Sequence, residues 1–496
     1  MEHQKFFLKG GYVSREEPLY FDDRPLADGD VVHQPDAYLI AHFIASRYDV
    51  DTIIDIGSGN GRKLMALEGV NKIGVDFGCN LEYCRQKYPT GTWIEADLER
   101  GSEIGIDDSV VARSIVICAD VIEHLVNPEN LLNLLRRLAA QARAIVLTTP
   151  ERDLVRGIQD MGPPANPSHI REWSLTEFDA LLRHSGLPPT FIGLTVNNNK
   201  NLEKKTILAI VDNGVSLCLS EPPQDFHPLA IIATYNDRDV APHVLRKLLD
   251  DEIDLHILDN WLDDGSYDDI LSVLSLAPSS FLERFPSHPE RYYEWKKILD
   301  RKAQIAAQHV GRWIIHQDSD EVRLSPWFGI SLRKGLWIAD QAGFNAVDFT
   351  VLDFRPVNDT FTVGDDPEVK LRRFEFGRRP GHFKQVKAWK QGPEPVSLSP
   401  SGGHDAQFSG RRVFPYKFIL KHYPFRNSEQ ARRKVLKERK ERFSPREREM
   451  GWHIQYDQYS DDSCFLWNEG QLVTFDDRDT RNHYMTELIS GIGIVR

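Results

Sequence analysis

The fold is indicated by residues 53–61, which read Ile-Ile-Asp-Ile-Gly-Ser-Gly-Asn-Gly. An apolar run that ends in a glycine-rich turn is typical of a buried strand followed by a helix. Glycines allow the backbone to turn sharply and to approach a ligand closely. Asp76 ends the next apolar run, about 20 residues further on, where an acidic side chain is positioned to bond ribose hydroxyls. Together these features predict a site for a cofactor that contains adenosine.

Short apolar runs alternate with helical stretches on both sides of this turn. Strands are predicted at 52–56, 71–75, 92–95, 114–118 and 144–148. Alternation of this kind predicts a parallel sheet that helices cover on both faces. Two further strands, near 190–196 and 205–211, flank an asparagine-rich turn and predict a hairpin.

A proline-rich stretch then interrupts the pattern. Residues 216–228 include three prolines, which is typical of a linker, and the alternation begins again at residue 229. We therefore predict two tandem α/β domains, at 1–215 and 229–496, joined by a linker at 216–228. Near the C-terminus, the highly charged stretch 428–450 predicts an exposed helix.

Two acidic residues favour S-adenosylmethionine (SAM) over a dinucleotide in the first domain. Asp55 lies two positions before the first glycine, where a carboxylate repels pyrophosphate but suits a cationic amino acid. Asp97 ends the third predicted strand. The motifs at 55–61, 74–76, 96–98 and 118–125, in this order, resemble those of class I SAM-dependent methyltransferases.

This resemblance covers residues 30–212 and implies a Rossmann-like seven-stranded sheet with the hairpin as its antiparallel strands. It implies that the glycine turn holds the methionine part of SAM, that the acid of the second strand holds the ribose, and that the acid of the third meets the adenine amino group. The cofactor-binding residues that it implies are Asp55, Gly57, Gly59, Asp76, Asp97 and Asp120.

Two histidines are candidates for the base that takes a proton from the methyl acceptor. His124 follows the fourth predicted strand, and His169 lies in a stretch, 166–173, that resembles an acceptor-pocket loop of related methyltransferases. In the alternative interpretation, Glu123 and His124 only cap and orient the following helix. A domain that binds SAM without catalysis is a further alternative.

In the second domain, three predicted strands end in polar residues. The first ends in Thr234-Tyr-Asn236, the second in Asp259, and the third in Asp318-Ser-Asp320. Two carboxylates two positions apart, just beyond a strand, can share Mg²⁺ or Mn²⁺, which prefer oxygen ligands and bridge to phosphates. Taken alone, such a pair is also typical of a surface turn.

The order of these strand ends is similar to that of family 2-like glycosyltransferases with the A-type fold, over residues 228–460. The resemblance implies a nucleotide-sugar donor, with a UDP-sugar favoured, at Thr234, Asn236, Asp259 and Asp318. It implies a divalent cation at Asp318 and Asp320, for which His422 is our candidate third ligand. His404 and Asp405 lead as candidates for the catalytic base, followed by Asp348 and Asp353.

The sequence thus predicts a bifunctional enzyme that transfers a methyl group and a sugar onto a glycan or glycolipid in surface polysaccharide biosynthesis. One alternative is a glycosyltransferase with a silent SAM-binding domain. Another is an enzyme that modifies proteins or natural products.

The composition limits the kinds of partner and the cellular compartment that fit this sequence. A net charge of -13 gives little support to nucleic-acid binding. No apolar run approaches the length of a transmembrane helix, and five cysteines without zinc-ligand spacing indicate a reducing compartment. We expect a cytoplasmic protein. Peripheral membrane association and oligomeric state stay open.

Overall fold

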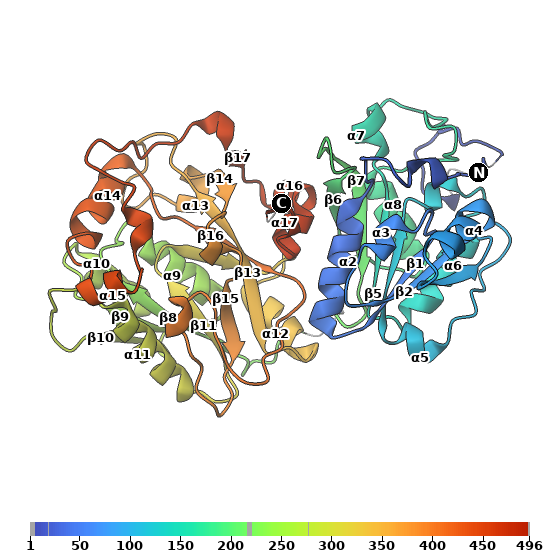
Figure 1. Cartoon of the computed structure of the whole chain (residues 1–496). Coiled ribbons are helices and arrows are strands. Elements are labelled where there is room, and N and C mark those ends of the chain that lie inside the picture. Colours follow the sequence, from blue (N-terminus) through green and yellow to red (C-terminus); the bar gives the residue numbers. More distant parts are fainter. Residues whose placement is uncertain (1–4, 18, 216–220, 276, 495–496) are drawn as a thin grey trace. The chain divides into compact units, whose positions relative to one another are not determined.

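The computed structural model describes residues 5–17, 19–215, 221–275 and 277–494, which fall into two compact units (Figure 1). Unit 1 comprises the described residues up to 215 together with Arg481–Gly493, and unit 2 comprises residues 221–480. Of the predicted linker, 216–220 lies outside the described residues. The rest belongs to unit 2, where Arg333 donates hydrogen bonds to the carbonyls of Pro223 and Phe226 at 2.8 and 2.7 Å.

Unit 1 is built on a 7-stranded sheet of order β3-β2-β1-β4-β5-β7-β6. Its strands are β1 (Thr52–Ile56), β2 (Asn71–Asp76), β3 (Thr92–Glu95), β4 (Ser114–Ala119), β5 (Ala144–Pro150), β6 (Phe191–Val196) and β7 (Lys204–Val211). β7 runs antiparallel to both of its neighbours, and the other pairs are parallel. The predicted α/β fold with a parallel-rich sheet is confirmed.

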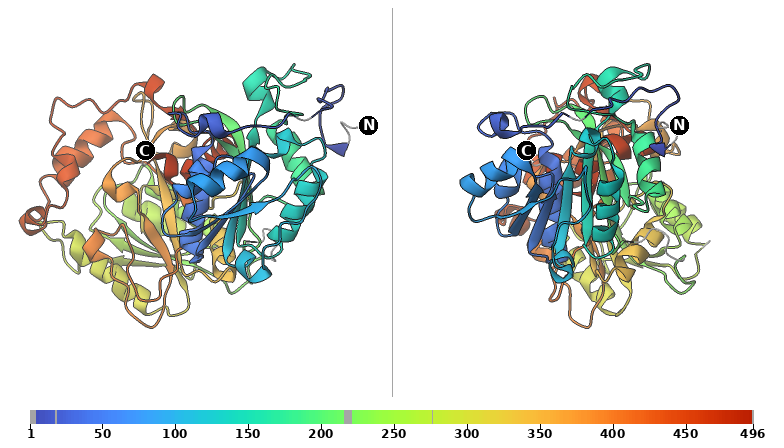
Figure 2. Two further views of the ribbon diagram at one scale, coloured as in Figure 1. Left: turned by 45° about the vertical axis from the view of Figure 1, so that its right-hand side comes forward. Right: turned by 90° about the vertical axis from the view of Figure 1, so that its right-hand side faces the viewer.

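Helices cover both faces of this sheet (Figures 1 and 2). The helices of unit 1 before β6 are η1 (Arg24–Leu26), α2 (Pro35–Tyr48), α3 (Arg62–Met65), α4 (Gly78–Lys87), α5 (Asp108–Val111), η2 (Ile122–His124), α6 (Glu129–Ala139), α7 (Arg152–Arg156) and α8 (Leu175–His184). The amphipathic α6 shows why they pack there, because it buries Leu131, Leu134, Leu135 and Leu138 in the core.

A C-terminal segment returns to unit 1, a difference from the predicted second domain at 229–496. After α16 (Asp477–His483), helix α17 (Met485–Ile489) packs against β6 with its residues buried. Gly193 in β6 permits this contact, because a Cβ there would lie 2.5 Å from the carbonyl oxygen of Asn482. Lys204 of β7 also forms an ion pair with Glu487.

Unit 2 contains a 10-stranded sheet with the main order β10-β9-β8-β11-β15-β13-β14-β17. Its strands are β8 (Leu229–Thr234), β9 (Asp254–Asp259), β10 (Phe281–Arg284), β11 (Trp313–Asp318), β12 (Glu321–Leu324), β13 (Ala346–Phe354), β14 (Arg373–Phe376), β15 (Val386–Lys390), β16 (Phe418–His422) and β17 (Val473–Thr474). From β10 to β11 the strands are parallel, so β8, β9 and β11 end at one edge. β12 pairs antiparallel with β16 and brings His422 opposite Glu321.

The helices of unit 2 are α9 (Ala241–Asp250), α10 (Ser266–Leu274), α11 (Trp295–Ala307), α12 (Leu332–Gln341), α13 (Pro367–Lys370), α14 (Ser428–Arg432), the π-helical η5 (Arg433–Arg439) and α15 (Pro445–Glu449). Single 3₁₀ turns lie at η3 (Pro380–His382), η4 (Ser399–Ser401), η6 (Ile454–Tyr456) and η7 (Glu469–Gln471), and η8 (Ile492–Ile494) follows α17. Within the described parts of the chain, no helix has the length and apolar character needed to cross a membrane.

Candidate functional site

The glycine turn of unit 1 connects β1 to α3. Gly57, Gly59 and Gly61 have φ angles of 77°, 54° and 70°, which side-chain-bearing residues rarely adopt. A Cβ on Gly57 would lie 2.4 Å from Cγ2 of Val121, so the turn also needs glycine for space. The backbone N–H of Gly59 donates to Oδ2 of Asp76 at 2.7 Å. The predicted turn and the predicted acid are therefore in direct contact.

Buried carboxylates surround this turn. Asp55 accepts a hydrogen bond from the Tyr38 hydroxyl at 2.8 Å, and its other oxygen, Oδ1, has no hydrogen-bond partner. Burial raises the pKa of Asp55 to about 7 and that of Asp76 to about 6. A cation bound beside the turn would favour the charged form of both groups.

A third carboxylate, Asp23, comes from an N-terminal segment that the sequence analysis could not place. Its Oδ2 accepts from the backbone N–H of Asn60 at 3.0 Å, and burial raises its pKa. The same segment is tied to the β2–α4 connection, because the Tyr20 hydroxyl donates to the carbonyl of Phe77 at 3.0 Å. This segment carries no hydrophobic periodicity, so no sequence signal marked it.

Asp97 and Asp120 follow β3 and β4, at the same edge of the sheet as the turn. Asp97 accepts from the backbone N–H of Glu99 at 3.0 Å and forms an ion pair with Arg100 at 3.2 Å. Asp120 has a φ of 54° and accepts from the Thr148 hydroxyl at 3.1 Å. Their contact with a cofactor stays a prediction.

The two histidines predicted as rival bases lie together. His124 and His169 have ring centroids 4.8 Å apart. Nδ1 of His124 is 2.9 Å from the carbonyl of Ser168, which can only accept, so this nitrogen carries the proton. Nδ1 of His169 lies 2.6 Å from Oε1 of Glu172. Burial lowers the pKa of His124 to about 4, so the ring is neutral at pH 7.

A cavity of about 840 Å³ lies in unit 2, at the edge where β8 and β11 end. Among the residues that line it are Thr234, Asp237, Asp318, Asp320, Lys387, His404, His422, Lys434 and Arg439. Ligands of open α/β sheets bind at this edge. Five of the predicted site residues in this list, at 234, 318, 320, 404 and 422, thus share one cavity.

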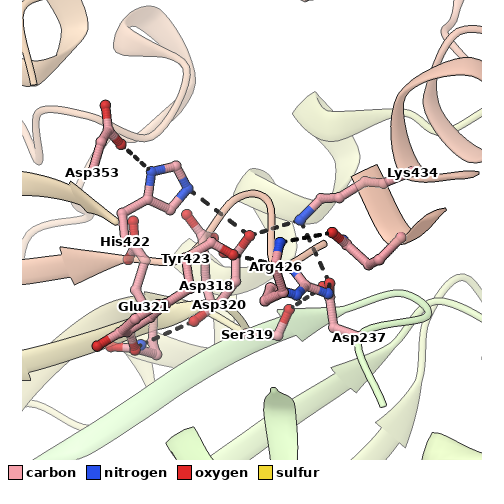
Figure 3. A network of polar contacts seen from close by, with 12 residues as sticks. Asp237, Asp318, Ser319, Asp320, Glu321, Asp353, His422, Tyr423, Arg426 and Lys434 are labelled. Atoms are coloured by element: carbon pink, nitrogen blue, oxygen red, sulfur yellow. Dashed lines mark hydrogen bonds and ion pairs between the residues drawn. The ribbon is translucent and has the colours of Figure 1, made fainter. Parts of the chain in front are cut away.

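Lysines hold both carboxylates of the Asp318-Ser-Asp320 motif. Lys387 lies 3.1 Å from Oδ2 of Asp318. Lys434 lies 2.7 Å from Oδ2 of Asp320 (Figure 3). Burial alone would raise the pKa of Asp318, but Lys387 and Lys302 lower it well below its usual range. Both carboxylates therefore have positive partners within the protein.

The predicted cation ligands do not form a metal site in this arrangement. Nδ1 of His422 donates to Asp353 at 2.7 Å, and Nε2 is 3.9 Å from Asp320 (Figure 3). Lysines already neutralise Asp318 and Asp320. Among the residues that the structure describes, no three metal-binding side chains of this cavity converge as a ligand set. We therefore derive no step through a cation here.

Two of the residues predicted to hold the nucleotide are absent from the described cavity lining. Nδ2 of Asn236 donates to Asp263 at 2.6 Å. Asp259 accepts from the backbone N–H of Leu262 at 2.8 Å and pairs with Arg284 at 3.3 Å. Both side chains therefore have partners within the protein.

Of the candidate bases, only His404 lines the described cavity. Burial lowers its pKa to about 4. Asp405 points its two oxygens at Arg411 and Lys384, at 2.5 and 2.6 Å, so the structure gives it an ion-pair role. The backbone N–H groups of residues 349 and 385 hold Asp348, and Asp353 is paired with His422 and Arg355.

Lys434 and Arg426 are the important residues that the sequence analysis missed. The stretch 428–450 was predicted to be an exposed helix, and this is wrong for Lys434, which is only 6% exposed. Arg426 is fully buried and binds Asp237 and Asp239 at 2.9 and 2.6 Å. Apolar neighbours of Lys434 at helical spacing, at 431 and 435, were the available signal for an inward face.

Comparisons with known proteins give matches to part of the chain. Residues 35–189 match the family model of a methyltransferase domain. A SAM-dependent methyltransferase from Aquifex aeolicus is 17% identical, with 39% of this chain and 100% of that chain covered and a TM-score of 0.27. Magnesium protoporphyrin IX methyltransferase from Synechocystis PCC 6803, solved with bound SAH, is also 17% identical, with 40% and 89% covered and a TM-score of 0.27. The comparison with curated proteins gave no match.

Proposed function

We propose that unit 1 transfers a methyl group from SAM to an acceptor. The observation that carries this proposal is a set of three carboxylates around a positive-φ glycine turn: Asp55 and Asp76, which are buried, and Asp23, which is partly buried. Such carboxylates are poorly solvated, so a ligand with positive charge gains from binding beside them. SAM carries a sulfonium and an ammonium group. The methyltransferase-domain match over 35–189 supports the same activity.

We assign each part of SAM to a residue at this edge of the sheet. Asp55, with its unpartnered Oδ1, faces the ammonium end of SAM, and Asp76 bonds the ribose hydroxyls while it orders Gly59. Asp97, after β3, stands nearer the adenine, and Asp120, after β4, stands on the Asp55 side of the ligand. An adenosine ligand uses turn backbone and strand-end acids in this way in Rossmann-like sheets generally.

Titration of the full chain with SAM tests this assignment. We expect Asp55→Asn and Asp76→Asn each to weaken SAM binding by about 10- to 100-fold, because each removes a charge-assisted contact. Asp108→Asn is the matched control, since Asp108 is exposed in α5, just before β4 begins at the opposite edge of the sheet. Equal loss in the control, or no loss in either site variant, would overturn the assignment.

For unit 2, we infer that the cavity binds a nucleotide-diphosphate sugar and transfers the sugar to a glycan or glycolipid. Its place at the ends of β8 and β11, and the cations Lys387, Lys434 and Arg439 in its lining, support this second candidate function. Lysine and arginine side chains offset the charge of a diphosphate. Among the other polar groups of the lining, Thr234 and His404 are our candidates to contact donor and acceptor.

A joint role of the two units in surface-polysaccharide biosynthesis follows from this proposal. Two other roles compete with it: a silent SAM-binding unit beside an active glycosyltransferase, and modification of proteins or natural products. Methyl transfer from labelled SAM to a glycan, against a peptide acceptor, separates these roles.

The donor proposal is tested by titrating the full chain with UDP, with and without Mn²⁺. We expect binding that Asp318→Ala changes and that Lys434→Gln weakens about tenfold. Binding that requires Mn²⁺ would restore the predicted cation at Asp318 and Asp320. If neither UDP nor GDP binds under either condition, the proposal for unit 2 fails.

A further inference from the structure

We propose that unit 1 binds a divalent transition-metal ion through Glu123, His124 and His169, and that this ion holds a hydroxyl of the methyl acceptor. The first half of this proposal concerns the ion alone. The second half rests on the proposed methyl transfer. Under this assignment the two histidines are ligands of a metal, in place of the predicted role of either as a base.

The three side chains form a ligand set across distant parts of the sequence. One ligand atom of each lies within 4.8 Å of the others, and no other group of this kind occurs in the described residues. The short η2 presents Glu123 and His124, and the loop before α8 brings His169 to them. Convergence of two imidazoles and a carboxylate from separate segments is the pattern of a built metal site.

Glu123 supplies the independent observation that a ligand is needed. Its side chain is fully buried, and Oε1 has no hydrogen-bond partner, while Oε2 accepts from the Thr149 hydroxyl at 3.1 Å. A buried carboxylate oxygen without a partner is costly. A cation placed between Oε1 and the two imidazoles would satisfy it.

Outer contacts orient both imidazoles as metal ligands usually are. Metal-binding histidines donate their second N–H to a carbonyl or carboxylate, which fixes the tautomer. His124 makes this contact with Ser168 at 2.9 Å, and His169 makes it with Glu172 at 2.6 Å. Nε2 of each ring is then the coordinating atom. The amide of Asn166 lies 2.9 Å from Nε2 of His169 and would move when the ion binds.

The types of ligand atom determine which metal ions fit the site. Two imidazole nitrogens and one carboxylate suit Zn²⁺, Mn²⁺, Fe²⁺ or Co²⁺, whereas Mg²⁺ prefers an all-oxygen shell. Three protein ligands leave coordination positions open, as in catalytic metal sites. An acceptor oxygen can take one of them.

Contacts place this cluster beside the cofactor turn. Val121, two residues before Glu123, packs against Gly57. The N-terminal segment touches both places, because the Phe21 ring lies 5.3 Å from the His124 ring and Asp23 accepts from the N–H of Asn60. An acceptor held at the cluster would therefore meet the methyl group of a cofactor held at the turn.

The chemistry points to an acceptor with a hydroxyl group. The ion would lower the pKa of the bound hydroxyl, and its proton would pass to water. The oxygen would then form a bond to the methyl carbon of SAM while the carbon–sulfur bond breaks and its electron pair stays on sulfur, leaving S-adenosylhomocysteine.

Titration of the metal-stripped full chain with Co²⁺, Zn²⁺, Mn²⁺ and Mg²⁺ tests whether the chain binds a transition-metal ion. We expect one equivalent of a transition ion to bind, with Co²⁺ ligand-field bands of nitrogen and oxygen coordination, and Mg²⁺ to bind at least tenfold more weakly. His124→Ala and His169→Ala should each weaken binding at least tenfold. His184→Ala, at an exposed histidine of the same unit, is the control and should bind as the parent does.

Two further variants keep the outcome clear. Glu123→Gln preserves shape and should also weaken binding, and its thermal unfolding is measured alongside in case the buried site does not fold. If Asp318→Ala abolishes the binding and the histidine variants do not, the ion belongs to unit 2 and the proposal fails. Absence of transition-ion binding also overturns it. Titration of metal-free His169→Ala with SAM distinguishes a failure of the metal proposal from a failure of the methyl-transfer proposal.

Discussion

The carboxylates of unit 2 and those of unit 1 differ in how their negative charge is compensated. In unit 2, Asp318 and Asp320 each face a lysine of the same chain. In unit 1, Asp55 and Glu123 are fully buried, and each keeps an oxygen without a partner. Because a buried charge needs compensation, the first cluster is complete in the free protein, and we propose that the second is completed by a bound ligand.

The largest expected effect comes from breaking the compensation in unit 2. Arg426→Met should destabilise the protein by about 3–5 kcal/mol, because it leaves Asp237 and Asp239 buried without their shared cation. Calorimetric unfolding measures the change. Arg183→Met is the control, since Arg183 forms only an exposed pair with Asp179, and it should cost less than about 1 kcal/mol. A loss of similar size in both variants would show that the buried network has no special role.

In unit 1, we expect substitution of a buried carboxylate to raise the stability of the protein. Asp55→Asn should raise the stability of the ligand-free protein at pH 8 by about 2–4 kcal/mol. The folded-state pKa of Asp55, about 7, lies above its ordinary value of 3.8, so the folded state binds the proton more tightly. Stability is then lost as pH rises from about 4 to 7, and the substitution removes that loss. Melting curves at pH 8 and pH 5 measure it, and a gain that does not shrink at pH 5 would contradict the cause given.

The affinity for SAM should depend on the protonation of the same carboxylates. We expect it to fall about tenfold from pH 8 to pH 5.5, because Asp55 and Asp76, with pKa values of about 7 and 6, take up protons in this range. Calorimetric titration across the range measures it. Asp55→Asn should flatten the profile, and an unchanged slope in this variant would assign the pH dependence to another group.

The smallest effect is expected at the edge of the unit 2 network. Lys384 pairs with Asp405, but its side chain is 56% exposed, and Arg411 holds the other oxygen. Lys384→Ala should change stability by less than about 1 kcal/mol. The same calorimetric measurement applies, and a cost as large as that of Arg426→Met would remove the distinction between buried and exposed pairs.

What the sequence predicted well depends on local pattern. The strand, the glycine turn and Asp76 follow from periodicity and spacing, and in the structure the N–H of Gly59 donates to Asp76. Asp23 was missed because its segment is ordered only by tertiary contacts with Asn60 and Asn80. The charges of 428–450 indicated a solvated face and outweighed the apolar pair at 431 and 435, so the inward turn of Lys434 to Asp320 was missed.

One reason explains why sequence spacing alone could decide neither metal assignment. Asp318 and Asp320 carry the residue types of a cation site, but spacing cannot reveal the lysines that approach them from β15 and η5. Glu123, His124 and His169 meet only in the folded chain, because 44 residues separate the imidazole of His124 from the loop around Ser168 that orients it. Partners from distant segments decide both cases.

The return of α17 to β6 makes unit 2 an insertion within unit 1. During synthesis, β6 leaves the ribosome long before the helix that covers it, with all of unit 2 made in between. Met485, Leu488 and Ile489 complete that face last. Unit 1 therefore reaches its final packing only after unit 2 has been translated, so the order of folding does not follow the order of the chain.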